Sequence, residues 1–163
     1  MQTVQEISSR KVAADAEAYF RSGFYCCEAV VAAIRDNFAP ELPKEVISLA
    51  SGMAVGVGRS GCLCGAVNGG ILALGLFFGR TEPTGPSDPR SIRCLALANE
   101  LHSWFREANG KGSACCRVLT REFDMGQGEH KEQCIRFTGL CAGKTAELLA
   151  RELGLRDRDA QPD

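Results

Sequence analysis

The sequence predicts an all-α fold, a compact single-domain bundle of about six or seven helices. No segment sustains the period-two alternation of apolar and polar residues that marks a half-buried strand. Several stretches instead combine helical apolar spacing with residues that begin or end helices, and residues 64–78 are apolar nearly all round, as in a central buried helix. The 163 residues suffice for one domain with a real core. We therefore expect residues 1–163 to form a single helical domain, with 155–163 as a mobile polar tail.

Helix boundaries follow from proline, glycine and capping residues. Proline suits the first helical turn, Asp caps amino ends, and glycine ends a helix in the left-handed conformation. The expected helices are 4–21 before Gly23, 26–38 before Pro40, 43–50 beginning at Pro43, 64–78, a helix from Asp88-Pro89 through Phe105, 114–121, and 131–153 before Gly154.

Composition narrows the function classes. A net charge of -1 gives no electrostatic reason to expect nucleic acid or an anionic membrane as a partner. The longest apolar run, "GGILALGLFFG", is too short to cross a bilayer, so we expect no membrane insertion. The amino-terminal residues lack the pattern of a signal peptide. A cytoplasmic protein is the resulting expectation.

The unusual feature is the number of cysteines, nine in all. In a reducing cytoplasm such a set is not expected to form a disulfide framework, and an odd number cannot pair completely. Three uses remain for each cysteine: ligation of a metal or cluster, thiol chemistry, or packing as a small hydrophobe.

The stretch "VGVGRSGCLCGAVNGG" (55–70) also contains Gly56-x-Gly58-x-x-Gly61, the letters of a dinucleotide-binding fingerprint. That fingerprint needs a preceding strand, a following helix and a second strand ending in an acidic residue. Glu82 has the right offset, but the segment leaves no room for a crossover helix. We therefore expect no NAD, and interpret these glycines as a flexible approach to Cys64.

Helical geometry separates the members of the adjacent cysteine pairs. Neighbouring residues on a helix point about 100° apart, so at most one of Cys26-Cys27 and one of Cys115-Cys116 should face a shared site. Cys26 lies on a stripe of small residues and is the better candidate, whereas Cys27 shares a stripe of larger apolar residues that is typical of packing.

Cys64 stands where the glycine-rich loop enters the buried helix. Free amides and the helix dipole there should lower the pKa of its thiol, which makes Cys64 the candidate redox thiolate. Cys62, two residues earlier, is the candidate resolving thiol. Cys134 and Cys141 share one face of the last helix, about 10 Å apart, too far to bind one iron or zinc together.

Two further residue types bear on the site. Arg59 and Arg117 could offset thiolate charge, although each alone is more typical of a solvated surface. His102 and His130 are expected at the surface or in a local hydrogen bond. No Cys-x-x-Cys-His occurs, so covalent haem c is not expected.

The pattern of cysteines resembles the C-GCAxxG-C-C proteins, small cysteine-containing proteins of bacteria and archaea named as redox-active. "GFYCCEAV", "CGAVNGG", "CCRVL" and "CIRFTGLCAGKTAELL" are similar to the successive family segments. The resemblance implies that four separated cysteines converge in a helical fold, and it places them at Cys26, Cys64, Cys116 and Cys134. Five cysteines lie outside this pattern: Cys27, Cys62, Cys94, Cys115 and Cys141.

A related domain occurs in split-Soret cytochrome c, where a [2Fe–2S] site has been proposed beside haem. Because the haem motif is absent here, the resemblance implies only the cluster. The leading hypothesis is an electron-transfer protein or oxidoreductase with an iron–sulfur cluster and an unknown redox partner. Two alternatives stay open, a thiol–disulfide relay led by Cys64 and a structural zinc or soft-metal site, and so does a homodimer.

Overall fold

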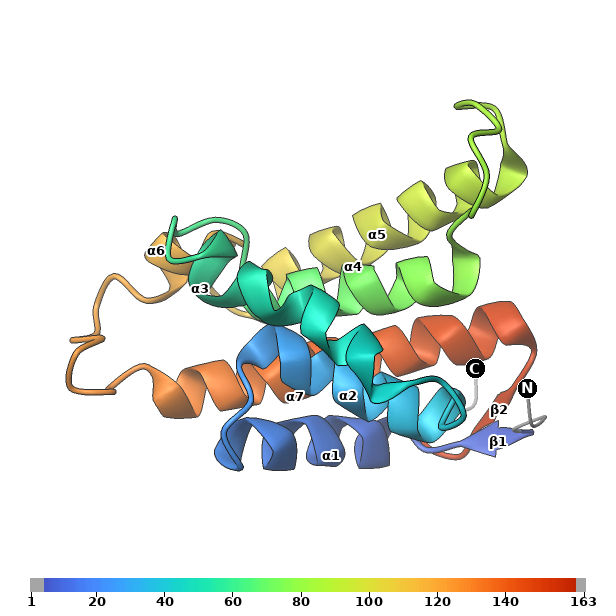
Figure 1. Ribbon diagram of the computed structural model, residues 1–163. Helices are drawn as coiled ribbons and strands as arrows, with labels where there is room; N and C mark the ends of the chain where they lie inside the picture. Colours follow the sequence, from blue (N-terminus) through green and yellow to red (C-terminus); the bar gives the residue numbers. More distant parts are fainter. Residues whose placement is uncertain (1–4, 161–163) are drawn as a thin grey trace.

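The computed structural model describes residues 5–160, and over these residues the all-α prediction is confirmed (Figure 1). Residues 5–160 form seven α-helices, one 3-10 helix and two strands of two residues each, and the longest connections precede α5 and α7. The elements in chain order are β1 (Glu6–Ile7), α1 (Ser9–Arg21), α2 (Cys26–Phe38), η1 (Lys44–Met53), α3 (Ala54–Val57), α4 (Gly65–Phe78), α5 (Pro89–Ala108), α6 (Cys116–Leu119), α7 (Lys131–Leu153) and β2 (Arg156–Asp157).

Three long helices, α2, α4 and α7, pack against one another and begin at the same end of the molecule, on the left in Figure 1. The short α6 lies at that end too, while α1 covers α7 and α5 covers α4. The amino ends of several helices are therefore brought together. Because each helix carries a partial positive charge at its amino end, a negative group beside these amino ends is favoured.

The core lies between α2, α4, α5 and α7. Its largest fully buried side chains include Ile34, Leu74, Leu101, Phe105 and Phe137. The rings of Phe105 and Phe137 meet edge to face with their centroids 5.3 Å apart, a preferred aromatic geometry. Since α4 is apolar around its circumference and packs on three helices, its sequence and its central position agree.

The capping predictions are confirmed at two helix ends. The Asp88 side chain accepts a hydrogen bond from the amide of Arg90, and Pro89 occupies the first position of α5. Gly154 ends α7 in the left-handed conformation, with φ of 67°. The segment beginning at Pro43 forms a 3-10 helix rather than an α-helix.

The first helix begins later than expected, because Ser8 caps it and the residues before Ser8 pair with the end of the chain. β1 and β2 run parallel, with Glu6 opposite Arg156. Ser8 also donates to Asp159, at 2.5 Å. Residues 155–160, expected as a mobile tail, are thus bonded to the start of the bundle, and residues 161–163 of that expectation lie outside the described residues.

None of the helices in residues 5–160 has the length and the hydrophobicity that a membrane crossing requires.

The contact between α2 and α4 depends on a glycine. A Cβ on Gly69 would lie 2.6 Å from the carbonyl oxygen of Cys27 and 2.9 Å from its Cα, so α2 and α4 would have to move apart.

We predict that Gly69→Ala destabilises the fold by about 1–3 kcal/mol through overpacking, measured by denaturant unfolding. Gly75→Ala is the matched control on the same helix, because nothing lies within 4 Å of its new Cβ. The control should gain about 0.5–1 kcal/mol from helix propensity; equal losses in both variants would contradict the packing argument.

Candidate functional site

Four of the nine cysteines line one cavity at the end of the bundle where the helices begin. The cavity has a volume of about 50 Å³, room for roughly three to five water-sized spheres. The remaining wall is almost entirely apolar. The lining residues are Phe20, Cys26, Val55, Cys64, Gly65, Ala66, Cys116, Met125, His130, Cys134 and Phe137.

Each of the four cysteines lies at the amino end of a different helix. Cys26 is the first residue of α2, Cys64 is the residue that caps α4, and Cys116 is the first residue of α6. Cys134 lies in the first turn of α7. Sites on helix ends are held by the backbone of rigid elements, so the positions of the four sulfurs depend on how the helices pack.

Cys26 is positioned by a hydrogen-bonded start of α2. The Glu28 carboxylate accepts from the Tyr25 amide at 2.8 Å and from the Ser51 hydroxyl at 2.5 Å, which ties α2 to η1. On the other side, the Cys26 sulfur lies so close to Gly65 that any Cβ there would overlap it. The first residue of α4 must be glycine for α2 and α4 to bring Cys26 and Cys64 to one cavity.

A left-handed turn leads into Cys64. All five residues from Val55 to Arg59 have positive φ, between 54° and 68°. The conformation is unfavourable for the two β-branched valines among them, and it places Val55 in the cavity wall. Gly56 allows the turn to close, because a Cβ there would lie 2.5 Å from the Cys62 nitrogen. The glycines thus build a tight turn rather than the flexible approach we expected.

Burial governs the thiol pKa values of three cavity cysteines. It raises the pKa of Cys134 to about 12, and it raises those of Cys64 and Cys116 as well. Charge on Cys26 is the second cause in all three cases. The thiols are therefore close enough to oppose one another's ionisation.

The pKa prediction for Cys64 was wrong. Amides of Ala66 and Val67 at the start of α4 do favour its thiolate, but the complete burial of the sulfur has the larger effect. Cys26 is the cavity thiol whose pKa is lowered, chiefly by hydrogen bonding from Cys27 and then, against burial, by backbone amides. The predicted helix effect is present at Cys64, and desolvation exceeds it.

One member of each adjacent pair lines the cavity and the other does not. Cys26 and Cys116 line the cavity, whereas Cys27 packs against η1, 3.1 Å from the Ala50 carbonyl oxygen, and Cys115 lies outside the lining. Cys141 is fully buried in the core and outside the cavity wall.

The structure brings Cys62 to Cys115 rather than to Cys64. Hydrogen bonding to the Cys115 thiol is the main cause of a raised pKa at Cys62, and the charge of Arg117 acts in the opposite direction. Arg117 and the exposed Arg59 are both absent from the cavity wall. Neither arginine therefore offsets thiolate charge from within the cavity wall.

His130 lines the cavity, which the sequence analysis missed. It immediately precedes α7, and burial lowers the pKa of its imidazole. Its Nδ1 atom is buried and has no hydrogen-bond partner within residues 5–160. A buried nitrogen on a residue that lines a thiol cavity is a polar group that still requires a partner. The one sequence feature that indicates this placement is that His130 directly precedes the helix bearing Cys134. His102 is half-buried on α5.

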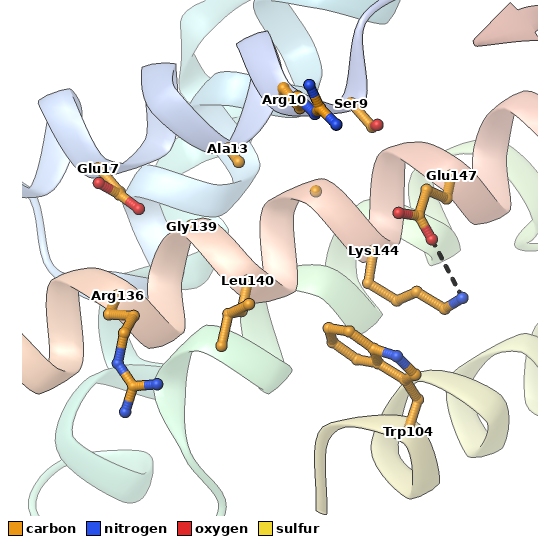
Figure 2. A pocket seen from close by; sticks show the side chains of 11 residues that line it. Ser9, Arg10, Ala13, Glu17, Trp104, Arg136, Gly139, Leu140, Lys144 and Glu147 are labelled. Atoms are coloured by element: carbon orange, nitrogen blue, oxygen red, sulfur yellow. Dashed lines mark hydrogen bonds and ion pairs between the residues drawn. The ribbon is translucent and has the colours of Figure 1, made fainter. Parts of the chain in front are cut away.

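Two observations delimit the site. Among residues 5–160, no three His, Cys, Asp or Glu side chains are grouped so that they could hold one metal ion. A larger hollow of about 240 Å³ lies between α1 and α7 and contains no cysteine. Figure 2 shows Trp104 and Lys144 on one side of it, with the ammonium of Lys144 3.2 Å from Glu147. Charged, polar and apolar residues line this hollow, and none of them lines the cysteine cavity.

A family model described as "Putative redox-active protein (C_GCAxxG_C_C)" matches residues 24–148. The match covers most of the chain and includes all four cavity cysteines. The chain therefore belongs to this family. Neither a curated protein nor a solved structure matches it.

The pKa of Cys134 gives a prediction for the metal-free protein. With a pKa of about 12, its thiolate fraction at pH 8 is about 10⁻⁴, against about a quarter for an ordinary thiol. We expect iodoacetamide to alkylate Cys134 about 10³-fold more slowly in the folded protein than in urea, measured by mass spectrometry. Because the folded-state pKa lies above the unfolded one, the fold should also lose stability as the pH rises above about 9. Equal labelling rates in both states would contradict the burial of this thiol.

Proposed function

We propose that this member of the family is an electron-transfer protein whose four cavity cysteines bind a [2Fe–2S] cluster. The observation that carries the proposal is the convergence of four thiols, from four helix starts, on one apolar cavity. Four thiolates are the usual ligand set of such a cluster. The ligands are Cys26, Cys64, Cys116 and Cys134.

The electrostatics of the cavity support a bound cation. Three of the four thiols are held protonated by burial and by one another's charge. A metal centre removes this conflict, because it deprotonates coordinating thiols outright and balances their charge. The same pKa values count against a thiol–disulfide relay at these sulfurs, since the thiolate is the reactive form.

The size of the cavity favours a cluster over a single zinc ion. Tetrahedral zinc sites hold sulfur about 2.3 Å from the ion, which leaves no space between the ligands. Here the cavity that the four cysteines line together with seven other residues has about 50 Å³ of free volume. The unpartnered Nδ1 of His130 also fits a cluster, whose sulfur atoms accept hydrogen bonds that adjust the reduction potential.

A bound cluster would supply one-electron transfer. The chain's own contribution is to hold the ligands and exclude water. The side chains of Phe20, Met125 and Phe137 form the apolar wall, and the helix amino ends turn positive dipole toward the thiolates. Rigid ligands keep the reorganisation on electron transfer small. A reducing compartment such as the cytoplasm keeps all nine thiols available, as the proposal requires.

The first test is the composition of the protein purified without oxygen. We expect a coloured protein with about two irons and two sulfides per chain, as a [2Fe–2S] cluster requires, which dithionite bleaches. Stoichiometric zinc in a colourless protein would instead support the structural metal site. A colourless protein with neither metal, even after reconstitution with iron and sulfide, would overturn the proposal.

Cysteine variants locate the ligands. Serine substitutions at Cys26, Cys64, Cys116 and Cys134 should each lose most of the iron and the visible absorption. Cys94→Ser is the matched control, because this half-buried thiol on α5 lies outside the cavity wall. It should keep full iron content, with circular dichroism establishing that every variant is folded. Iron loss in the control alone would refute the ligand assignment.

His130 provides a second prediction on the same centre. His130→Ala removes a hydrogen-bond donor facing the cavity and should lower the reduction potential of the cluster while leaving iron bound. His130→Gln, which restores a donor, should recover part of the shift. Protein-film voltammetry measures the potentials, and an unchanged potential in His130→Ala would show that the imidazole does not contact the centre.

A further inference from the structure

A second pair of thiols lies near the cavity and outside its wall. Cys62 is exposed and Cys115 is half-buried, and the Cys115 thiol is close enough to raise the pKa of Cys62. Neither belongs to the four-cysteine pattern of the family. They come from parts of the chain far apart in sequence, the loop before α4 and the loop before α6.

Backbone hydrogen bonds clamp these two loops together on both sides of the pair. The Cys64 amide donates to the Ala114 carbonyl at 2.7 Å, and the Arg117 amide donates to the Gly61 carbonyl at 2.9 Å. The Arg117 guanidinium adds a bond to the Ser60 carbonyl at 2.7 Å. The loops that carry Cys62 and Cys115 are thus held side by side by their backbones.

The surroundings of the pair differ from those of the cavity. Cys62 is open to solvent, whereas Cys64 and Cys116 are buried. Thiol–disulfide exchange needs access for the incoming disulfide. Of these three sulfurs, Cys62 meets this requirement, and Cys115 on the neighbouring loop can take the second step.

We propose that Cys62 and Cys115 form a reversible dithiol–disulfide couple that reacts with low-molecular-weight disulfides. This redox site is separate from the four-cysteine cavity, and it does not rest on the presence of a cluster. The sequence suggested a thiol–disulfide relay between Cys64 and Cys62, and this proposal places that chemistry at Cys62 and Cys115 instead.

The reaction balances without a further oxidant. One thiolate of the pair attacks a sulfur of the small disulfide, the disulfide bond breaks, and one small thiol leaves. The second thiolate attacks the mixed disulfide and releases the second small thiol. The protein gains one sulfur–sulfur bond and loses two hydrogens, which end on the two released thiols.

Oxidation would join two segments of the cavity wall and stabilise the fold. Cys62 is two residues from Cys64, and Cys115 is adjacent to Cys116. A disulfide would therefore join the two segments that carry two of the cavity cysteines, and it would constrain the unfolded chain between residues 62 and 115. The oxidised protein should melt at a higher temperature than the reduced one.

The probe is glutathione disulfide, added under anaerobic conditions to the 163-residue chain, as isolated and after chelation of iron. In both samples we expect an intact mass lower by two hydrogens, a peptide joining Cys62 to Cys115 in an unreduced digest, and full reversal by dithiothreitol. Because the iron-free sample is included, a missing cluster would not affect this result. No change in mass, persistent glutathione on the wild-type protein, or a bond between other cysteines would overturn the proposal.

Single variants test the pairing independently. Cys62→Ser and Cys115→Ser should each fail to lose the two hydrogens and should instead retain one glutathione on the remaining partner. Cys94→Ser, the matched control, should form the Cys62–Cys115 bond like the wild type. A disulfide that still forms in Cys62→Ser would show that Cys62 is not a member of the couple.

Discussion

The structure depends on one constraint, the burial of four thiols together in an apolar cavity. Burial, and after it the charge of Cys26, raises the pKa of Cys64, Cys116 and Cys134. The fold nevertheless directs four helix amino ends at the same place, an arrangement that favours negative charge. The cluster that we propose would reconcile these opposing features by placing a cation among the sulfurs. The helix packing, the absence of a side chain at Gly65 and the strained turn at Val55 bring the four cysteines to one cavity.

The family resemblance implied the convergence of the four cysteines, and helical periodicity predicted the helices that carry them. The angle between adjacent residues limited each pair to one site cysteine, the small residues beside Cys26 favoured it over Cys27, and capping chemistry placed the start of α5 at Asp88. Both inferences are local, because they depend on residues within one or two turns. The pKa of Cys64 could not be obtained in this way. It depends on how completely other helices exclude water from the sulfur, and no short stretch of sequence contains that information.

Contacts between distant segments account for most of what sequence could not predict. The pairing of β1 with β2 joins residues near the two ends of the chain, and each strand is too short to show alternation. His130 enters the cavity wall only because α7 packs beside α4. The left-handed turn at 55–59 includes two valines, residues that sequence rules place elsewhere. Its strain is sustained by surrounding contacts and lies at the site, as strain often does in functional regions.

The nine cysteines separate by environment into sets suited to different chemistry. In the cavity, Cys64 and Cys116 are buried and Cys26 and Cys134 are half-buried, and burial raises the thiol pKa of all except Cys26. Cys62 is exposed, and its loop and that of Cys115 are held by the same backbone bonds that position Cys64 and Cys116. An oxidant arriving at the surface meets Cys62 first. The two proposed activities, two-electron thiol chemistry and one-electron transfer, would thus be neighbours in one small protein without sharing a sulfur atom.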